Sequence, residues 1–219
     1  MHANRPVRID ELSHVVSDDV GPDAIQRVRA LVRRLASALP TGTLVRDLAT
    51  ARLTVPDDSI DAVRFTALAT AARRHLREGE HDLVAADVDV AISLWRSDPY
   101  PELAARVSAT PEIERLRRVR VGVLEMQQEV SMHGGVDFTT VADLRDLVDT
   151  HPDRLGLRLL LARALHLMDR QADALGVLRQ TASDFGGHPA SRRLTDLIAH
   201  RDLRVASLSI IDVDDEPLH

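Results

Sequence analysis

Two similar stretches decide the fold. The first is Asp137-Phe138-Thr139-Thr140-Val141-Ala142-Asp143-Leu144, and the second is Gln171-Ala172-Asp173-Ala174-Leu175-Gly176-Val177-Leu178. Val141 and Leu144 recur 34 positions later as Leu175 and Leu178. Between them runs an apolar helical pattern, followed by Phe185-Gly186-Gly187-His188-Pro189.

A period of about 34 residues is typical of tetratricopeptide-type helix-turn-helix repeats. One such unit cannot bury its apolar stripe alone, so it requires stacked neighbours. Helical spacing of apolar residues continues on both sides of the repeat. We therefore predict an all-α fold from Ser59, the expected N-cap of its first helix, to about Arg204. The expected helices start near 59, 83, 110, 137, 171 and 190, with a long apolar helix after His151-Pro152 between the two similar stretches.

The chain before Ser59 has a different pattern. A short helix is predicted from Ile9 to Val16, and a longer one from Pro22 to about Leu39. The buried face of the longer helix is predicted to hold Ile25, Val28, Val32, Leu35 and Leu39. Two short strands, 43–45 and 52–55, are the predicted β structure.

Composition excludes several classes of protein. The 219 residues allow one large or two small domains. Cysteine is absent, which excludes disulfides and thiolate ligands. No apolar run approaches the ~18 residues of a membrane span, and no signal peptide opens the chain. We expect a cytoplasmic protein without membrane contact.

Basic residues are concentrated in one segment. The net charge is −6, and every basic residue is arginine. Six arginines lie between 24 and 55 against the single acid Asp47, whereas residues 209–219 form an acidic tail. A locally basic segment in an acidic chain is a weak indication of a phosphate-facing surface.

No pattern for catalysis, cofactor binding or metal binding is present. The chain has no phosphate-binding loop and no nucleophile elbow. No close histidine pair occurs, and His151 and His188 each precede a proline at a repeat boundary. Trp95, with Tyr100 nearby, is more typical of a core anchor than of a ligand platform. We predict no enzyme activity, no cofactor and no metal.

From Ser59 to Leu208 the chain resembles the bacterial transcriptional activator domain (BTAD) of Streptomyces antibiotic regulatory protein (SARP) transcription factors. The matching pieces keep their order and spacing: Asp61 to Phe65, Ala91 to Arg96, Glu114 to Arg117, His151-Pro152, Arg170 to Leu175, and Phe185 to Leu194. The resemblance implies three stacked helix pairs over residues 59–208.

Residues 1–58 resemble the back half of the family's winged-helix domain. The resemblance places the end of a first helix at 2–7, a recognition helix at about 24–39 and a wing at about 43–55. It implies DNA contacts by Gln26, Arg27, Arg29, Arg33, Arg34, Arg46 and Arg52. We expect no counterpart of the family's N-terminal sheet or of most of its first helix. The wing also lacks the usual Gly-Tyr.

The resemblance implies a transcriptional regulator of a secondary-metabolite gene cluster. Its partners would be double-stranded DNA, RNA polymerase or another protein on the helical repeats, and a second copy of the chain. The alternative is a helical-repeat module that binds a protein or an effector and does not read DNA.

Overall fold

The computed structural model describes residues 4–16, 21–106, 109–202 and 205. The elements, in chain order, are β1 (Val7–Arg8), α1 (Ile9–Val16), α2 (Pro22–Ala38), β2 (Leu44–Arg46), β3 (Thr50–Leu53), η1 (Asp57–Ser59), α3 (Asp61–Glu78), α4 (His81–Leu94), η2 (Pro101–Leu103), α5 (Thr110–His133), α6 (Phe138–Thr150), α7 (Leu155–Leu167), α8 (Gln171–Asp184) and α9 (Pro189–Ala199). The chain divides into two units, Met1–Leu68 with Ser93–Arg120, and Ala69–Ile92 with Val121–His219. The predicted helical fold is confirmed, with small differences at the helix ends.

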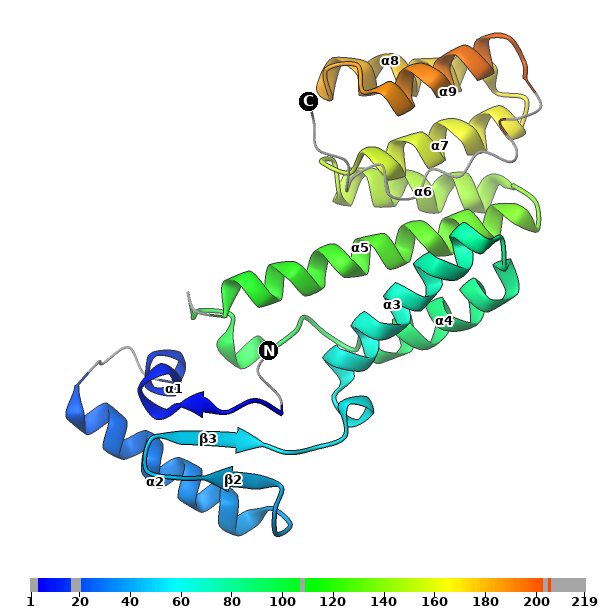
Figure 1. The fold of residues 1–219 in the computed structure, drawn as a ribbon. Coiled ribbons are helices and arrows are strands. Elements are labelled where there is room, and N and C mark those ends of the chain that lie inside the picture. Colours follow the sequence, from blue (N-terminus) through cyan, green and yellow to red (C-terminus); the bar gives the residue numbers. More distant parts are fainter. Residues whose placement is uncertain (1–3, 17–20, 107–108, 203–204, 206–219) are drawn as a thin grey trace. The chain divides into compact units, whose positions relative to one another are not determined.

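In the first unit, α1 and α2 pack beside a three-stranded antiparallel sheet (Figure 1). The strand order is β1-β3-β2, so β3 pairs with both of the others. The core between helices and sheet is small, with Ile9, Val28, Val32 and Ala51 buried. β2 and β3 correspond to the two predicted strands, 43–45 and 52–55, each shifted by one or two residues, so this prediction is confirmed.

Three local expectations for this unit were wrong. Val7, where the resemblance placed the end of a helix, forms β1 together with Arg8, because the backbone of these two residues pairs with Ala51 and Thr50. Leu35 and Leu39 are 54% and 37% exposed, since the small core ends at Val32.

The third concerns Ser59, which does not cap α3. It lies in η1, where its hydroxyl donates to the Pro56 carbonyl, and α3 begins at Asp61.

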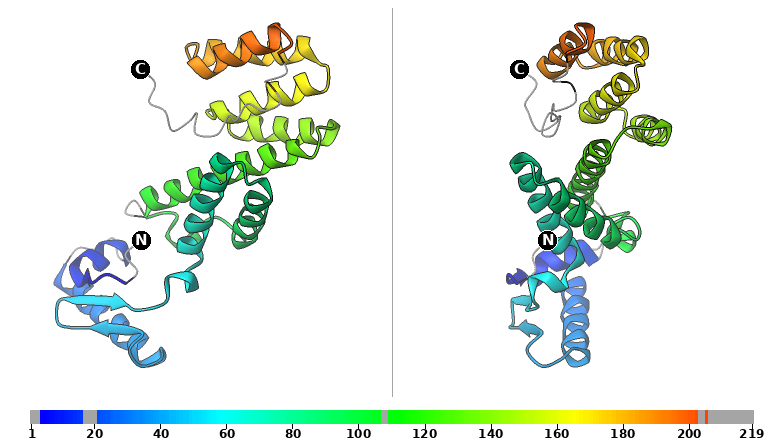
Figure 2. Two further views of the ribbon diagram at one scale, coloured as in Figure 1. Left: turned by 45° about the vertical axis from the view of Figure 1, so that its right-hand side comes forward. Right: turned by 90° about the vertical axis from the view of Figure 1, so that its right-hand side faces the viewer.

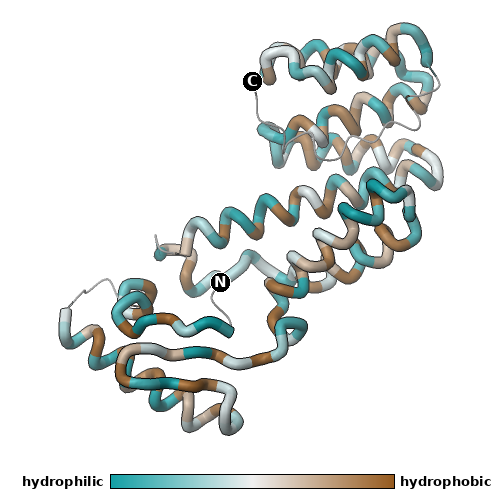
Figure 3. The backbone as a smooth tube through the Cα atoms, in the orientation of Figure 1, coloured by the Kyte–Doolittle hydropathy of each residue, from teal (hydrophilic) through white to brown (hydrophobic). Residues whose placement is uncertain are grey.

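In the second unit, α6 to α9 stack as consecutive antiparallel helices (Figure 2). Hydrophobic residues recur along all four (Figure 3). α7 is buried on every side between Leu155 and Leu165, apart from Arg158. Val141, Leu144 and Leu178 are buried in the same core, and Leu175 packs against it. The 34-residue repeat therefore places equivalent apolar residues in equivalent core positions.

Charged side chains enter this core as pairs. Arg163, on α7, is 2% exposed and donates to Glu129 of α5, which is 4% exposed. One turn earlier on α5, Glu125 accepts from Arg154 at 2.8 Å. A buried charge is tolerated only when a partner compensates for its desolvation. The two pairs therefore fix which face of α5 meets the chain around α7.

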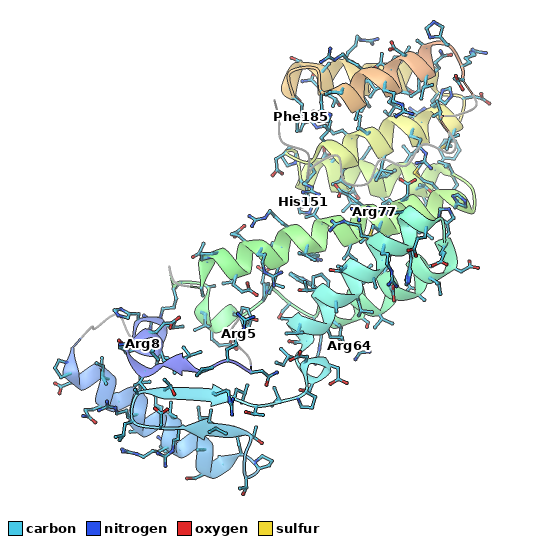
Figure 4. The ribbon with its side chains drawn as sticks, in the orientation of Figure 1. Arg5, Arg8, Arg64, Arg77, His151 and Phe185 are labelled. Atoms are coloured by element: carbon cyan, nitrogen blue, oxygen red, sulfur yellow. The ribbon has the colours of Figure 1, made fainter. Side chains whose placement is uncertain are left out.

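Specific residues define the repeat boundaries. Asp137 caps α6 by accepting from the Thr140 amide at 2.8 Å, as in a capping box. Gly186 and Gly187 adopt positive φ after α8, and the His188 side chain then caps α9. Beside this turn Arg158 stacks over Phe185, labelled in Figure 4, at 5.1 Å. The helix-terminal role expected of His188 is confirmed. The predicted acidic tail, 209–219, lies outside the described residues.

Candidate nucleic-acid interface

One face of α2 presents polar and basic side chains. Pro22 occupies the first turn after Gly21, where its missing amide hydrogen costs nothing. Ala24, Val28 and Val32 point into the core, which turns the opposite face outward. The side chains exposed there are Gln26, Arg27, Arg33 and Arg34. α2 has one acid, Asp23 in its first turn, so its outer face is strongly basic.

The β2–β3 hairpin positions two further arginines. The Asp47 carboxylate accepts from the amides of Ala49 and Thr50, both at 2.7 Å, and from the Thr50 hydroxyl. These bonds close the turn and lower the pKa of Asp47. The carboxylate is thereby committed to the turn.

Strand register separates Arg46 from Arg52. Arg46 pairs with Ala51, whose side chain is buried against the helices, whereas Arg52 pairs with Val45. Directly paired residues project from the same face of a sheet, and successive residues alternate. Arg46 therefore lies on the α2 side of the sheet and Arg52 on the opposite side.

Arg29 links α2 to the hairpin. Its side chain is half-buried, and Nη2 donates to the Leu48 carbonyl at the hairpin tip at 3.2 Å. Its sequence context does not reveal this contact, because the acceptor is a backbone carbonyl 19 positions away. Arg29 thus holds the basic helix and the basic hairpin in one arrangement.

Arg8 belongs to the same unit but is paired. Its guanidinium, labelled in Figure 4, donates to both Asp10 carboxylate oxygens, at 2.9 and 2.6 Å. The hydrogen bond from Arg8 holds the pKa of Asp10 down at about 2. Arg8 and Asp10 therefore largely neutralise each other.

One histidine cluster in the described part of the chain has the geometry of metal ligands. Ligand atoms of His75, Glu78 and Glu80 lie within 4.8 Å of one another. Arg74 Nη2 lies 2.8 Å from His75 Nε2, and Arg74 Nε lies 3.9 Å from Glu78. A guanidinium therefore already balances this cluster, and we assign no metal to it.

Comparison with known proteins identifies the helical part. Residues 60–200 match the bacterial transcriptional activator domain. The chain belongs to this family. The resemblance to SARP-type regulators is thereby confirmed for the helical repeats of the BTAD.

Relatives extend the match along the chain. The Regulatory protein DnrI of Streptomyces peucetius is 31% identical over 64% of this chain and 53% of its own length. The Transcriptional regulatory protein EmbR of Mycobacterium tuberculosis is 27% identical over 86% of this chain and 52% of its own. The chain thus spans about half the length of these curated relatives.

A solved structure has the same fold as this BTAD chain. It is that of Mycobacterium tuberculosis EmbR in complex with a low affinity phosphopeptide, with a TM-score of 0.84 and 25% identity. The match covers 98% of this chain and 60% of that one, so it includes the α1–α2 and sheet portion. None of the described helices has the length and hydropathy needed to cross a membrane.

Proposed function

We propose that this BTAD protein is a SARP-type transcriptional regulator that binds promoter DNA through residues 1–58. The relatives DnrI and EmbR are named as regulatory proteins, which supports a role in transcription. A helix pair backed by a three-stranded sheet agrees with the winged-helix resemblance, with α2 as recognition helix and β2–β3 as wing.

The observation that best supports DNA binding is the exposed basic face of α2. Arg27, Arg33 and Arg34 project from one helix, and the neighbouring hairpin has Arg46 on the face of the sheet that is turned toward α2. Guanidinium groups bind phosphate oxygens and guanine edges, often with two hydrogen bonds each. A helix of this kind can enter the major groove, which is wide enough to accept it.

The helical repeats carry the remaining part of the role. We infer that they contact RNA polymerase, or a second copy of the chain, at promoters of a secondary-metabolite gene cluster. Stacked helix pairs present extended surfaces that suit protein partners. The family consists of transcriptional regulators, so the role that we infer is non-enzymatic. A regulator that binds the chromosome would act in the cytoplasm.

The test is binding of this chain to duplex DNA from its own gene neighbourhood. Fluorescence anisotropy at moderate salt would compare that duplex with a scrambled duplex of equal length. We expect tighter binding to the native sequence by roughly 10³-fold, as for specific DNA-binding proteins. Equal binding to both would reduce the claim to non-specific DNA binding, and no binding by the folded chain would reject it.

The two hairpin arginines are expected to differ in effect. Arg46→Ala should weaken DNA binding by about tenfold, because it removes a charge-assisted hydrogen bond on the α2 side. Arg52→Ala, its matched control on the opposite face, should change the affinity by about twofold or less. The same anisotropy titration measures both. An Arg52→Ala effect as large as that of Arg46→Ala would contradict the assigned side of contact.

Exposed leucines favour the alternative of a protein-interaction module. Leu31, Leu35 and Leu39 are 42%, 54% and 37% exposed on α2 and at its C-cap. Apolar side chains gathered on one helix often mark a protein interface. This alternative requires that the chain is folded and yet fails to bind DNA at low salt.

A further inference from the structure

A cavity in the first unit is lined by aromatic and proline side chains. Its volume is about 340 Å³, within the range of small-ligand sites. The larger apolar side chains lining it include those of Phe65, Trp95, Pro99, Tyr100, Pro101 and Leu116. They come from α3, the loop after α4, the start of η2, and α5. The cavity is separate from the basic face of α2.

Two of the aromatic rings that line the cavity pack against each other. Phe65 and Trp95 have ring centroids 5.3 Å apart and are tilted by 53°. Phe65 is buried, which anchors the pair, while Trp95 and Tyr100 remain partly exposed. Trp95 therefore serves both as packing for Phe65 and as a lining residue of the cavity.

The indole of Trp95 already attracts one cation. The Arg120 guanidinium lies 5.1 Å from the ring centroid, and Arg120 is not among the residues that line the cavity. The face of an aromatic ring carries negative charge density and attracts ammonium and guanidinium groups. The ring of Trp95 therefore accommodates a guanidinium in this structure.

Charged side chains also line the cavity. They are the acids Asp61 and Asp98 and the base Arg96. Burial raises the pKa of Tyr100, the nearby carboxylates of Glu112 and Asp61 raise it further, and the Arg115 guanidinium opposes them. Asp98 is bonded to Arg117 at 2.7 Å, which leaves Asp61 as the acid that a ligand would meet.

The backbone at Tyr100 is strained. It adopts φ 52° and ψ 55°, a left-handed conformation that is costly for a residue with a side chain. Such strain is concentrated at ligand sites, where it holds a side chain in place. Here it holds the Tyr100 ring at the cavity.

We propose that this cavity binds an organic cation, a guanidinium or ammonium group, between the rings of Trp95 and Tyr100 and the carboxylate of Asp61. The group would come either from a small molecule or from an arginine or lysine side chain of a protein. Cation binding in this cavity would not depend on DNA recognition by α2, so each proposal can be tested without the other.

The fluorescence of Trp95 reports this binding directly, because it is the one tryptophan of the chain. The whole protein would be titrated at constant ionic strength with butylguanidinium, tetramethylammonium and a capped Gly-Arg-Gly peptide. The capped Gly-citrulline-Gly peptide is the uncharged match. We expect a saturable change with low-millimolar Kd for the cations, and at least tenfold weaker binding for the citrulline peptide.

The probes distinguish the source of the cation. Tighter binding of the arginine peptide than of butylguanidinium indicates a protein side chain, and the reverse indicates a small molecule. Equal binding of the citrulline peptide would overturn the proposal, because the cavity would then select shape and not charge. The absence of a saturable change with all cations would also overturn it.

Two variants locate the site. Asp61→Asn should weaken cation binding by about three- to tenfold, whereas Asp58→Asn, a matched removal of charge outside the lining, should leave it unchanged. Tyr100→Gly removes the ring at a backbone position that glycine adopts without strain. It should weaken binding by more than threefold while the chain remains folded. Unchanged affinity in both Asp61→Asn and Tyr100→Gly would reject the assigned site.

Discussion

Replacing Arg163 with methionine is expected to destabilise the chain by about 3–5 kcal/mol, a large fraction of the stability of a domain. Methionine fills a similar volume, so the destabilisation arises from charge and not from a cavity. Without Arg163 the Glu129 carboxylate remains in the core with no positive partner from α7. Urea denaturation followed by circular dichroism measures the change.

A double variant separates the cost of an uncompensated charge from the value of the pair. Arg163→Met with Glu129→Met should restore most of the stability that the single variant lacks, because no charge of this pair then stays buried. Asp173→Ala is a surface control, since its partner Arg170 lies beside it at the exposed start of α8. A single variant as stable as the wild type, or a double variant no better than the single one, would contradict the role assigned to the pair.

The second large effect concerns DNA. Arg33→Ala with Arg34→Ala should weaken binding to the duplex of the gene neighbourhood by about 10- to 100-fold, because two charge-assisted hydrogen bonds are removed. Anisotropy titration at one salt concentration gives the affinities. Circular dichroism verifies that α2 still forms, which we expect since both side chains are exposed.

A matched control lies in the second unit. Arg192→Ala with Arg193→Ala removes two adjacent arginines near the start of α9 and changes the net charge by the same amount. We expect this variant to bind about twofold more weakly or less, through general electrostatics alone. An equal effect in both double variants would mean that net charge, and not the α2 surface, governs binding.

The helices could be predicted because their apolar residues keep a helical period over long segments. Proline and glycine then mark their ends, as Pro22 does for α2 and Gly186 for α8. The 34-residue repeat, in which Val141 and Leu144 correspond to Leu175 and Leu178, predicted that the helices stack, since equal spacing predicts equal core positions. These are local or periodic signals, which a single sequence contains.

Features that depend on distant partners could not be predicted. β1 has two residues and exists because β3, more than 40 positions later in the chain, pairs with it through Thr50 and Ala51. Leu35 continues the apolar stripe of α2, but the stripe does not indicate where the covering sheet ends. The partner of Arg163 is Glu129, on a different helix.

The candidate sites also include features that the sequence predicts and features that depend on distant partners. The basic segment of α2 is visible in the sequence because its arginines recur on one face of a helix. The assignment of Arg46 and Arg52 to opposite faces depends on strand register, which two short strands do not specify. The aromatic cavity depends on Phe65, Trp95 and Tyr100 meeting in space, although the packing role expected of Trp95 agrees with its place beside Phe65.

The salt dependence of DNA binding tests the central claim most directly. The slope of log K against log [salt] would be measured for the wild type and for Arg33→Ala with Arg34→Ala. If both side chains bind phosphates, the variant's slope should be shallower by about 1.8, or roughly 0.9 for each phosphate no longer neutralised. An unchanged slope, or wild-type binding that does not depend on salt, would contradict the claim that α2 lies on DNA.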